Sequence, residues 1–175
     1  MNLLDLDAAR TAATAAPVAF GPIVLARGVG QGPTTLAAFD TALLDAGVAN
    51  YNLICLSSVI PPGSVIERRR WHTPPQQWGQ RLYCVMSQVR EDRPGYEGHA
   101  GIGWVRSDDA GHGLFVELHD DDRHRLERDL QATLETMQRN RGVALGAVHT
   151  EITSVRCDEL PVCALVIAVY ASQAW

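Results

Sequence analysis

Hydrophobic positions recur with a helical period in two parts of the chain. In residues 34–46 and 121–141 the apolar side chains lie three or four positions apart, which predicts two amphipathic helices. Thr34 or Thr35 can cap the start of the first helix, and Gly47 can end it. The expected buried faces consist of Leu36, Phe39, Leu43 and Leu44 in the first helix and of Leu126, Leu130, Leu134 and Met137 in the second.

Shorter apolar runs between glycine and proline residues predict a multi-stranded sheet. The expected strands are residues 22–27, 52–56, 82–89, 101–106, 114–118, 143–155 and 162–170. Residues 28–32 contain glycine at every second position and are expected to form a flexible connection. The alanine-rich residues 1–16 are expected to form a loose arm or a short helix without a catalytic role. Because no internal repeat or linker divides the chain, we expect a single α+β domain, residues 1–175, built as a layered sandwich with mainly antiparallel sheets.

The composition is typical of a folded protein. The 175 residues are 46% hydrophobic, with a mean hydropathy of −0.06. No apolar run approaches the ~20 residues of a membrane helix, and no early basic cluster marks a secretory signal, so we expect a cytoplasmic protein that does not bind membranes. A net charge of −5 with scattered arginines argues against nucleic acid binding, and the basic run Arg68–Arg70 is interpreted as exposed surface.

The cysteines and histidines predict neither disulfides nor a metal site. The four cysteines form no CxxC pair and lie in or beside apolar segments, where a free thiol behaves as a small hydrophobic group. His149 and Glu151 form a His-x-Glu pair, but no Pro-Cys-x-x-Cys follows it, so a core or edge-strand histidine is favoured over a zinc deaminase.

The chain contains no lysine, since all 15 basic residues are arginine. Pyridoxal phosphate is held through a lysine Schiff base and is therefore not expected as a cofactor.

Ser57-Ser58 follows the expected strand 52–56, and Pro61-Pro62 prevents that strand from continuing in the centre of a sheet. A serine at such a turn occupies a strained, exposed position where its hydroxyl can attack a neighbouring peptide carbonyl. A carbonyl group that forms an imine with a substrate amine could thus be made from the chain itself, without pyridoxal phosphate.

A set of residues in a fixed order carries a resemblance to a known family. The set consists of Asp40, Asn52, Ser57-Ser58 before Pro61-Pro62, and Glu117. It resembles the pyruvoyl-dependent arginine decarboxylase family. The resemblance implies self-cleavage between Ser57 and Ser58 into a β chain, residues 1–57, and an α chain, residues 58–175, with Ser58 converted to a covalent pyruvoyl group. It also implies that this cofactor decarboxylates L-arginine to agmatine and CO₂.

The resemblance further implies a role for each residue of the set. Ser58 Oγ would attack the Ser57 carbonyl carbon, and the Asn52 amide would hydrogen-bond a reacting carbonyl. Glu117, with its pKa raised among apolar neighbours, would donate a proton to the substrate, and Asp40 would bind the guanidinium group. Without the resemblance, the preferred roles would be a satisfied buried amide for Asn52, an edge-strand acid for Glu117 and a helix-surface acid for Asp40.

Members of this family assemble as homotrimers with sites at subunit boundaries, which would let Asp40 reach the pyruvoyl group of a neighbour. Two alternatives remain open. The same cofactor could act on another amino acid, because substrate choice depends on Asp40 and on pocket walls. The chain could also be a trimeric relative that binds a small ligand without processing itself.

Overall fold

The computed structural model describes residues 21–175, so the predictions for residues 1–16 lie outside the described part of the chain. The elements in chain order are β1 (Ile23–Gln31), α1 (Thr35–Ala46), β2 (Asn52–Cys55), β3 (Val59–Ile60), β4 (Ile66–Arg68), a short 3₁₀ helix (Pro75–Gln77), β5 (Arg81–Glu91), β6 (Glu97–Arg106), β7 (Gly113–Asp120), α2 (Arg123–Arg141), β8 (His149–Arg156) and β9 (Val162–Gln173). One sheet has the order β2-β5-β9-β1-β4 and the other β3-β7-β6-β8. Only the edge pairs β1/β4 and β2/β5 of these described strands are parallel. The α+β fold with mainly antiparallel sheets is confirmed.

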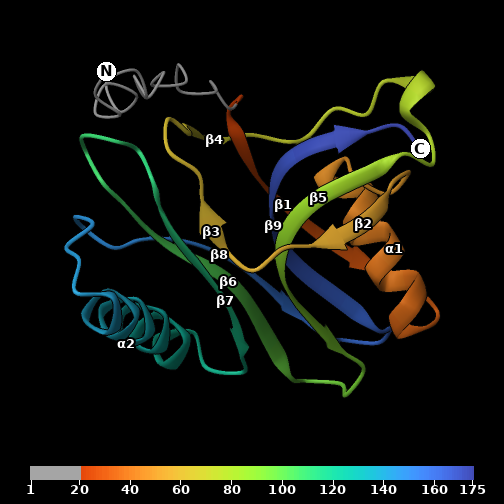
Figure 1. Ribbon diagram of the computed structural model, residues 1–175. Helices are drawn as coiled ribbons and strands as arrows, with labels where there is room; N and C mark the ends of the chain where they lie inside the picture. Colours follow the sequence, from red (N-terminus) through yellow and green to blue (C-terminus); the bar gives the residue numbers. More distant parts are fainter. Residues whose placement is uncertain (1–20) are drawn as a thin grey trace, which may run out of the picture.

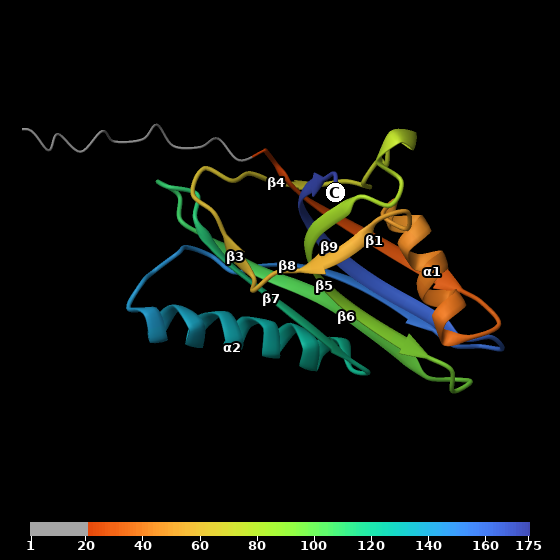
Figure 2. The same cartoon turned by 45° about the vertical axis from the view of Figure 1, so that its right-hand side comes forward.

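The elements form four layers, with α1 outside the five-stranded sheet, α2 outside the four-stranded sheet, and the two sheets face to face between them (Figure 1, Figure 2). Each of the three boundaries contains its own apolar core. Val24 and Leu165 pack under α1, Ile102 and Phe115 lie between the sheets, and Leu130 lies under α2.

Residues 28–31 of the glycine-rich segment belong to strand β1 and are not the flexible connection that we expected; Gly32 follows the end of the strand. A Cβ atom at Gly28 would lie 2.0 Å from the Ala42 carbonyl oxygen, and one at Gly30 would lie 2.2 Å from the Ala38 oxygen. Gly28 and Gly30 therefore leave this end of one face of β1 without side chains, so that α1 can approach the strand closely there.

This close approach changes the buried face of α1. The fully buried side chains are the small Ala38, Ala42 and Ala46, together with the nearly buried Leu43. Leu36 and Leu44 were expected in the core but are 65% and 50% exposed. The prediction was wrong because it assigned the largest apolar side chains to the core. Where α1 lies against Gly28 and Gly30 of β1, there is room only for side chains as small as alanine.

The local signals at the helix ends were read correctly. Thr34 Oγ1 accepts a hydrogen bond from the Ala37 amide at 3.1 Å, and Gly47 ends α1 in the left-handed conformation with φ 88°. Helix α2 ends in the same way at Gly142. Its buried residues Leu126, Leu130 and Leu134 are three of the four expected, and the fourth, Met137, is partly buried.

Two strand predictions need correction. The apolar segment 52–56 was expected to form a buried strand, but strand β2 is half exposed, because it is the edge of its sheet and pairs only with β5. Residues 143–148 were expected to begin a long strand, but β8 begins at His149. The apolar residues of this segment instead contact α2, since Leu145 and Val148 belong to the cluster beneath that helix.

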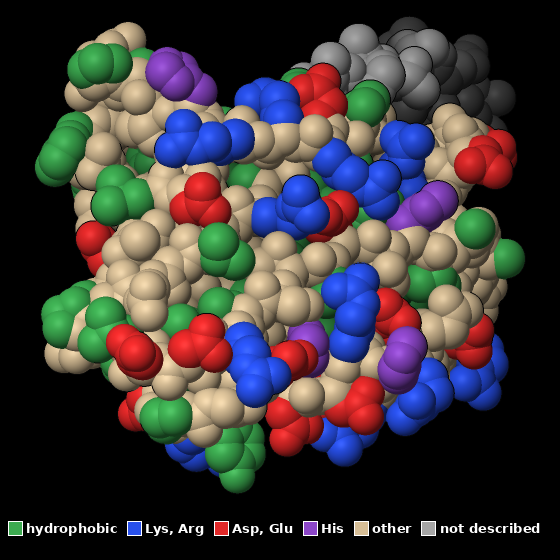
Figure 3. Space-filling model, turned by 180° about the vertical axis from the view of Figure 1, so that it is seen from behind, with side chains coloured by type: hydrophobic (Ala, Val, Ile, Leu, Met, Phe, Trp, Pro, Cys, Tyr) green, Lys and Arg blue, Asp and Glu red, His purple; other side chains and the backbone are tan. Residues whose placement is uncertain are grey.

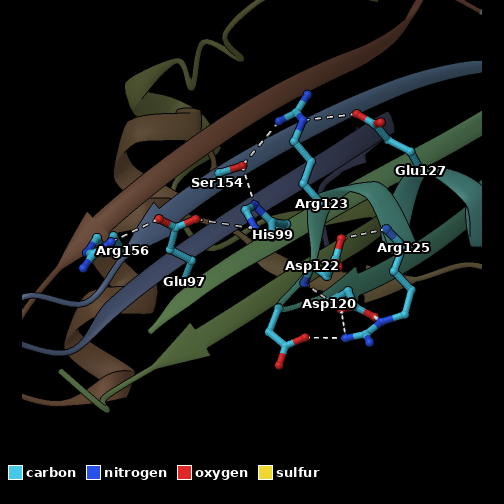
Figure 4. Close-up of polar contacts among 10 residues, drawn as sticks. Glu97, His99, Asp120, Asp122, Arg123, Arg125, Glu127, Ser154 and Arg156 are labelled. Carbon is cyan, nitrogen blue, oxygen red and sulfur yellow. Dashed lines mark hydrogen bonds and ion pairs between the residues drawn. The ribbon is translucent and has the colours of Figure 1, made fainter. Parts of the chain in front are cut away.

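A polar network fixes the start of α2 to the four-stranded sheet (Figure 4). Arg123 on α2 contacts Glu127 and the Ser154 hydroxyl of β8, and that hydroxyl lies 2.7 Å from Nδ1 of the buried His99 on β6. Arg125 binds Asp120 at the end of β7 at 2.7 Å. These contacts hold β7 and α2 in a fixed relation.

Candidate active site

The chain crosses from one sheet to the other at residues 56–58. The Leu56 amide donates to the Cys84 carbonyl in the five-stranded sheet at 2.9 Å. Two residues later, the Ser58 carbonyl accepts from the Phe115 amide in the four-stranded sheet at 2.8 Å. The peptide bond between Ser57 and Ser58 therefore bridges the two sheets, with both flanks held by hydrogen bonds.

Ser58 has a strained backbone. Its φ is 65°, and it is the only non-glycine residue with positive φ in residues 21–175. This conformation costs on the order of 1–3 kcal/mol and persists only where the surroundings impose it. The strain lies directly beside the peptide bond expected to break.

Ser58 and Glu117 are in direct contact although 59 positions separate them in the sequence. Ser58 Oγ donates to Glu117 Oε2 at 2.7 Å. Glu117 lies on β7, where it follows Phe115 by two positions and therefore points into the layer between the sheets. Burial raises the pKa of the Glu117 carboxyl, and the hydrogen bond from Ser58 opposes the shift only in part. Glu117 Oε1 is buried without a hydrogen-bond partner in the described structure, so the carboxyl retains a free acceptor.

Tyr170 was predicted only as the end of a strand, but it belongs to the same group. Its hydroxyl donates to the Val59 carbonyl at 3.0 Å, and its ring meets Phe115 edge-on at 6.1 Å. Burial, and secondarily the charge of Glu117, raise the pKa of the Tyr170 phenol above its usual range. A tyrosine that ends a wholly apolar run was the available signal, because a buried hydroxyl requires a partner.

A cavity of about 360 Å³ opens beside Ser57. Its lining consists of Gly21, Ile23, Leu56, Ser57, Val59, Pro61, Ser64, Tyr83, Tyr170 and Ala171. This lining is mostly apolar and includes no acidic side chain from residues 21–175. The cavity can hold the aliphatic part of a small molecule, but the lining offers no counterion to a guanidinium group.

The remaining two predicted site residues lie apart from this group. The Asn52 side chain donates to the Gly79 carbonyl at 2.7 Å, so its amide fastens the start of β2 to the turn that precedes β5. Asp40 is exposed on α1, in the outer layer beyond the five-stranded sheet, whereas β3 and β7 lie in the other sheet (Figure 1, Figure 2). The structure therefore brings together Ser57, Ser58 and Glu117, and it leaves Asn52 and Asp40 outside the group.

A second cavity, of about 690 Å³, contains none of the predicted site residues. Arg27, Arg68, Arg69 and Arg70 line it, and Figure 3 shows arginine side chains gathered with acidic ones on this face of the molecule. Glu151 lies 3.4 Å from Arg27 and 2.9 Å from Arg68. The excess of arginine makes this cavity unsuitable for a cationic substrate.

Residues 21–175 contain no cluster of three or more histidine, cysteine or acidic side chains arranged to hold a metal ion. Neither helix in this part of the chain is both long and apolar enough to span a bilayer.

Comparison with known proteins agrees with this geometry. The family described as pyruvoyl-dependent arginine decarboxylase matches residues 22–174. A pyruvoyl-dependent arginine decarboxylase of Halobacterium salinarum is 39% identical over 99 residues, which are 57% of this chain and 61% of the relative. Pyruvoyl-dependent arginine decarboxylase 1 of Methanosarcina acetivorans is 31% identical over 93 residues, 53% of this chain and 56% of the relative. The chain thus spans roughly three fifths of the curated relatives that it matches. Because the family match covers nearly all of the described residues, the chain belongs to the pyruvoyl-dependent arginine decarboxylase family.

Proposed function

We propose that this protein cleaves itself between Ser57 and Ser58, carries the resulting pyruvoyl group at residue 58, and decarboxylates arginine to agmatine and CO₂. The observation that carries the proposal is the 2.7 Å hydrogen bond from Ser58 Oγ to the buried Glu117 carboxylate at a strained serine. A hydroxyl beside a carboxylate of raised pKa has a base positioned to remove its proton.

The self-cleavage can be written from these atoms. Ser58 Oγ gives its proton to Glu117 Oε2 and attacks the Ser57 carbonyl carbon, which breaks the peptide bond and leaves an ester with the Ser58 amine free. Elimination then removes the proton from Ser58 Cα, which passes to water, and breaks the Cβ–Oγ bond. This step releases the Ser57 carboxylate and leaves dehydroalanine at position 58. Water converts this residue to pyruvoyl with loss of ammonia. Separation of Ser57 from Ser58 also relieves the left-handed strain at Ser58.

The residues around position 58 fit a pyruvoyl group. That group would supply a ketone that takes up the amine of the substrate and draws in the electrons left by departing CO₂. The Phe115 amide donates to the carbonyl oxygen of residue 58, next to that ketone, and would stabilise negative charge developing there. Glu117, whose raised pKa favours the protonated form, would return a proton to the substrate's α-carbon.

We further propose that the protein is a homotrimer and that Asp40 binds the guanidinium group in a neighbour's site. Two observations support this arrangement. The cavity beside Ser57 has no acid in its lining, and Asp40 lies between Leu36 and Leu44 at four-residue spacing on the exposed face of α1. An apolar stripe around a carboxylate suits contact with another subunit.

The intact mass of the denatured protein tests the cleavage. We expect fragments 1–57 and 58–175, with pyruvoyl at the new N-terminus, and a single uncleaved chain for Ser58→Ala. An uncleaved wild-type chain under all folding conditions would contradict the proposal and leave a ligand-binding relative. Turnover of arginine compared with other amino acids then tests the substrate, and preference for another amino acid would overturn the arginine assignment alone.

Mixed trimers test the position of Asp40. Asp40→Asn subunits retain the residues of cleavage, and Ser58→Ala subunits retain Asp40, so each variant alone should be nearly inactive. If Asp40 acts on a neighbouring site, refolding the two variants together should restore activity in the mixed interfaces. A mixture as inactive as its components would place Asp40 in its own subunit's site or outside any site. Asp129→Asn, which changes an exposed acid on α2, is the matched control.

A further inference from the structure

Two of the four cysteines stand opposite each other on neighbouring strands. Cys55 on β2 and Cys84 on β5 are register partners in the parallel pair, and register partners on adjacent strands point to the same face. Neighbouring strands are ~4.8 Å apart, which lies within the range of about 4.4–6.8 Å that disulfides span between Cα atoms. The two residues are therefore placed for a bond without a large movement of the backbone.

The two thiols also differ in a way that suits a disulfide site. Cys55 is exposed and open to a dissolved oxidant, whereas Cys84 is fully buried. Burial, with a smaller contribution from the charge and hydrogen bond of Cys55, raises the pKa of Cys84 to about 12. The other cysteines lack such a partner, since Cys163 on β9 stands opposite Gly30 and Arg90.

The pair lies at the edge of the candidate active site. Cys55 precedes Ser57 by two residues, and the Cys84 carbonyl holds the Leu56 amide at 2.9 Å. Strand β2 has only four residues and forms the edge of its sheet, so few other contacts hold the chain just before the scissile bond.

We propose that Cys55 and Cys84 form a reversible disulfide that fastens the end of β2 to β5. If the proposed cleavage occurs, on which this consequence rests, the bond joins the two processed chains covalently. This pair could not be recognised in the sequence, because 29 positions separate the cysteines and only the β2/β5 register brings them together.

The oxidant is a low-molecular-weight disulfide such as oxidised glutathione. The exposed Cys55 thiolate attacks it, forms a mixed disulfide and releases one thiol. Cys84 then loses its proton and attacks the Cys55 sulfur, which releases a second thiol. Two protein thiols are oxidised and one small disulfide is reduced to two thiols. The second step is the slow one, because little Cys84 thiolate exists near neutral pH.

The experiment uses the Ser58→Ala variant, in which the disulfide is measured without cleavage. After equilibration with oxidised glutathione and alkylation in denaturant, we expect a chain two hydrogen atoms lighter, two thiols unavailable for alkylation, and a peptide cross-link between residues 55 and 84. Cys55→Ser should abolish the cross-link. Cys157→Ser should retain it, because its hydroxyl can replace the Cys157 Sγ contact with the Leu160 carbonyl.

A second readout uses the processed wild-type protein. On denaturing electrophoresis without reductant the two chains should migrate together after oxidation and separately after reduction. Cys55 present only as a mixed disulfide with glutathione, or a cross-link that persists in Cys55→Ser, would overturn the proposal. A cross-link in Ser58→Ala with no cleavage of the wild type would instead refute the proposed processing and leave the disulfide standing.

Discussion

Replacement of Glu117 by glutamine should separate its role as a base from a role in positioning. Glutamine has nearly the same size and keeps an oxygen that can accept the Ser58 hydroxyl, but it can neither take up a proton nor carry charge. A hydrogen bond to a charged group contributes about 1.5–3 kcal/mol, and a positioned general base contributes about 10²–10⁴-fold in rate. We therefore expect self-cleavage of Glu117→Gln to be at least about a hundredfold slower than that of the wild type.

The assay follows the fraction of intact chain by mass after refolding from denaturant, over a range of pH. The wild-type rate should rise with pH as the Glu117 carboxyl ionises, and its midpoint should lie above that of an ordinary glutamate because burial raises this pKa. Glu117→Gln should lack this rise. Glu159→Gln, which changes an exposed acid in a bend, is the matched control.

The stability of the same variant provides an independent check. Burial raises the pKa of Glu117 in the folded state, so its ionisation lowers the free energy of unfolding as pH rises from the usual glutamate range through the raised pKa. Glu117→Gln should not lose stability in this pH range. At neutral pH its free energy of unfolding should be at least as high as that of Ser58→Ala, an uncleaved variant that keeps the Glu117 carboxyl. A variant that cleaves within about tenfold of the wild-type rate would refute the assignment of Glu117 as the base.

Three further changes test the surroundings of the site. Tyr170→Phe should slow cleavage and lower the free energy of unfolding by about 1 kcal/mol, measured by urea titration, because the Val59 carbonyl loses its donor. Gly30→Ala should destabilise by about 1–3 kcal/mol in the same assay, since the new Cβ would meet the α1 backbone at 2.2 Å, whereas Gly21→Ala has open space and should be neutral. Glu91 has its pKa lowered to about 2 by Arg93, so the stability that it contributes should be present above the usual glutamate range and be lost as pH falls toward 2; Glu91→Gln should flatten that part of the stability profile.

The sequence predicted those parts of the fold that depend on neighbouring residues. Thr34 and Gly47 identify the ends of α1 because capping involves residues only a few positions apart. The buried face of α2 was also predictable, since its leucines repeat with the helical period.

The predictions were wrong where the structure of a segment depends on another element that packs against it. Glycines at positions 28, 30 and 32 indicate a flexible segment when taken alone, and only the approach of α1 explains why the first two lie in a strand. The exposure of Leu36 and Leu44 follows from the same contact. Side-chain size was a poor guide because the backbone of α1 approaches β1 closely at Gly28 and Gly30, where only small side chains fit between them.

In the candidate site, too, local sequence predicted some features, whereas others depend on how distant strands pair. The serine pair was recognisable from local sequence, but its contact with Glu117 spans 59 positions and follows from the pairing of β3 with β7. Asn52 was expected to hydrogen-bond a reacting carbonyl at the serines, but its amide binds the Gly79 carbonyl, at the end of β2 that lies away from Ser57. Tyr170 reaches the site from β9, the central strand of the other sheet. The apolar run before it indicates a hydroxyl that needs a partner, but not that the partner is Val59.

The position of the scissile bond also explains how the chain could break without unfolding. Strand β1, which belongs to the N-terminal fragment, lies between β9 and β4, and both of these strands come from residues 58–175. Its register with β9 runs from Val24 to Gln31, and α1 covers it with a buried alanine face. The N-terminal fragment would thus be held as an inner strand and a helix of a completed core, while the bond that breaks joins two short strands in different sheets. The fold can tolerate the strained backbone of Ser58 because the packing that imposes this strain does not depend on the Ser57–Ser58 peptide bond. Breaking that bond would relieve the strain and leave the packing in place.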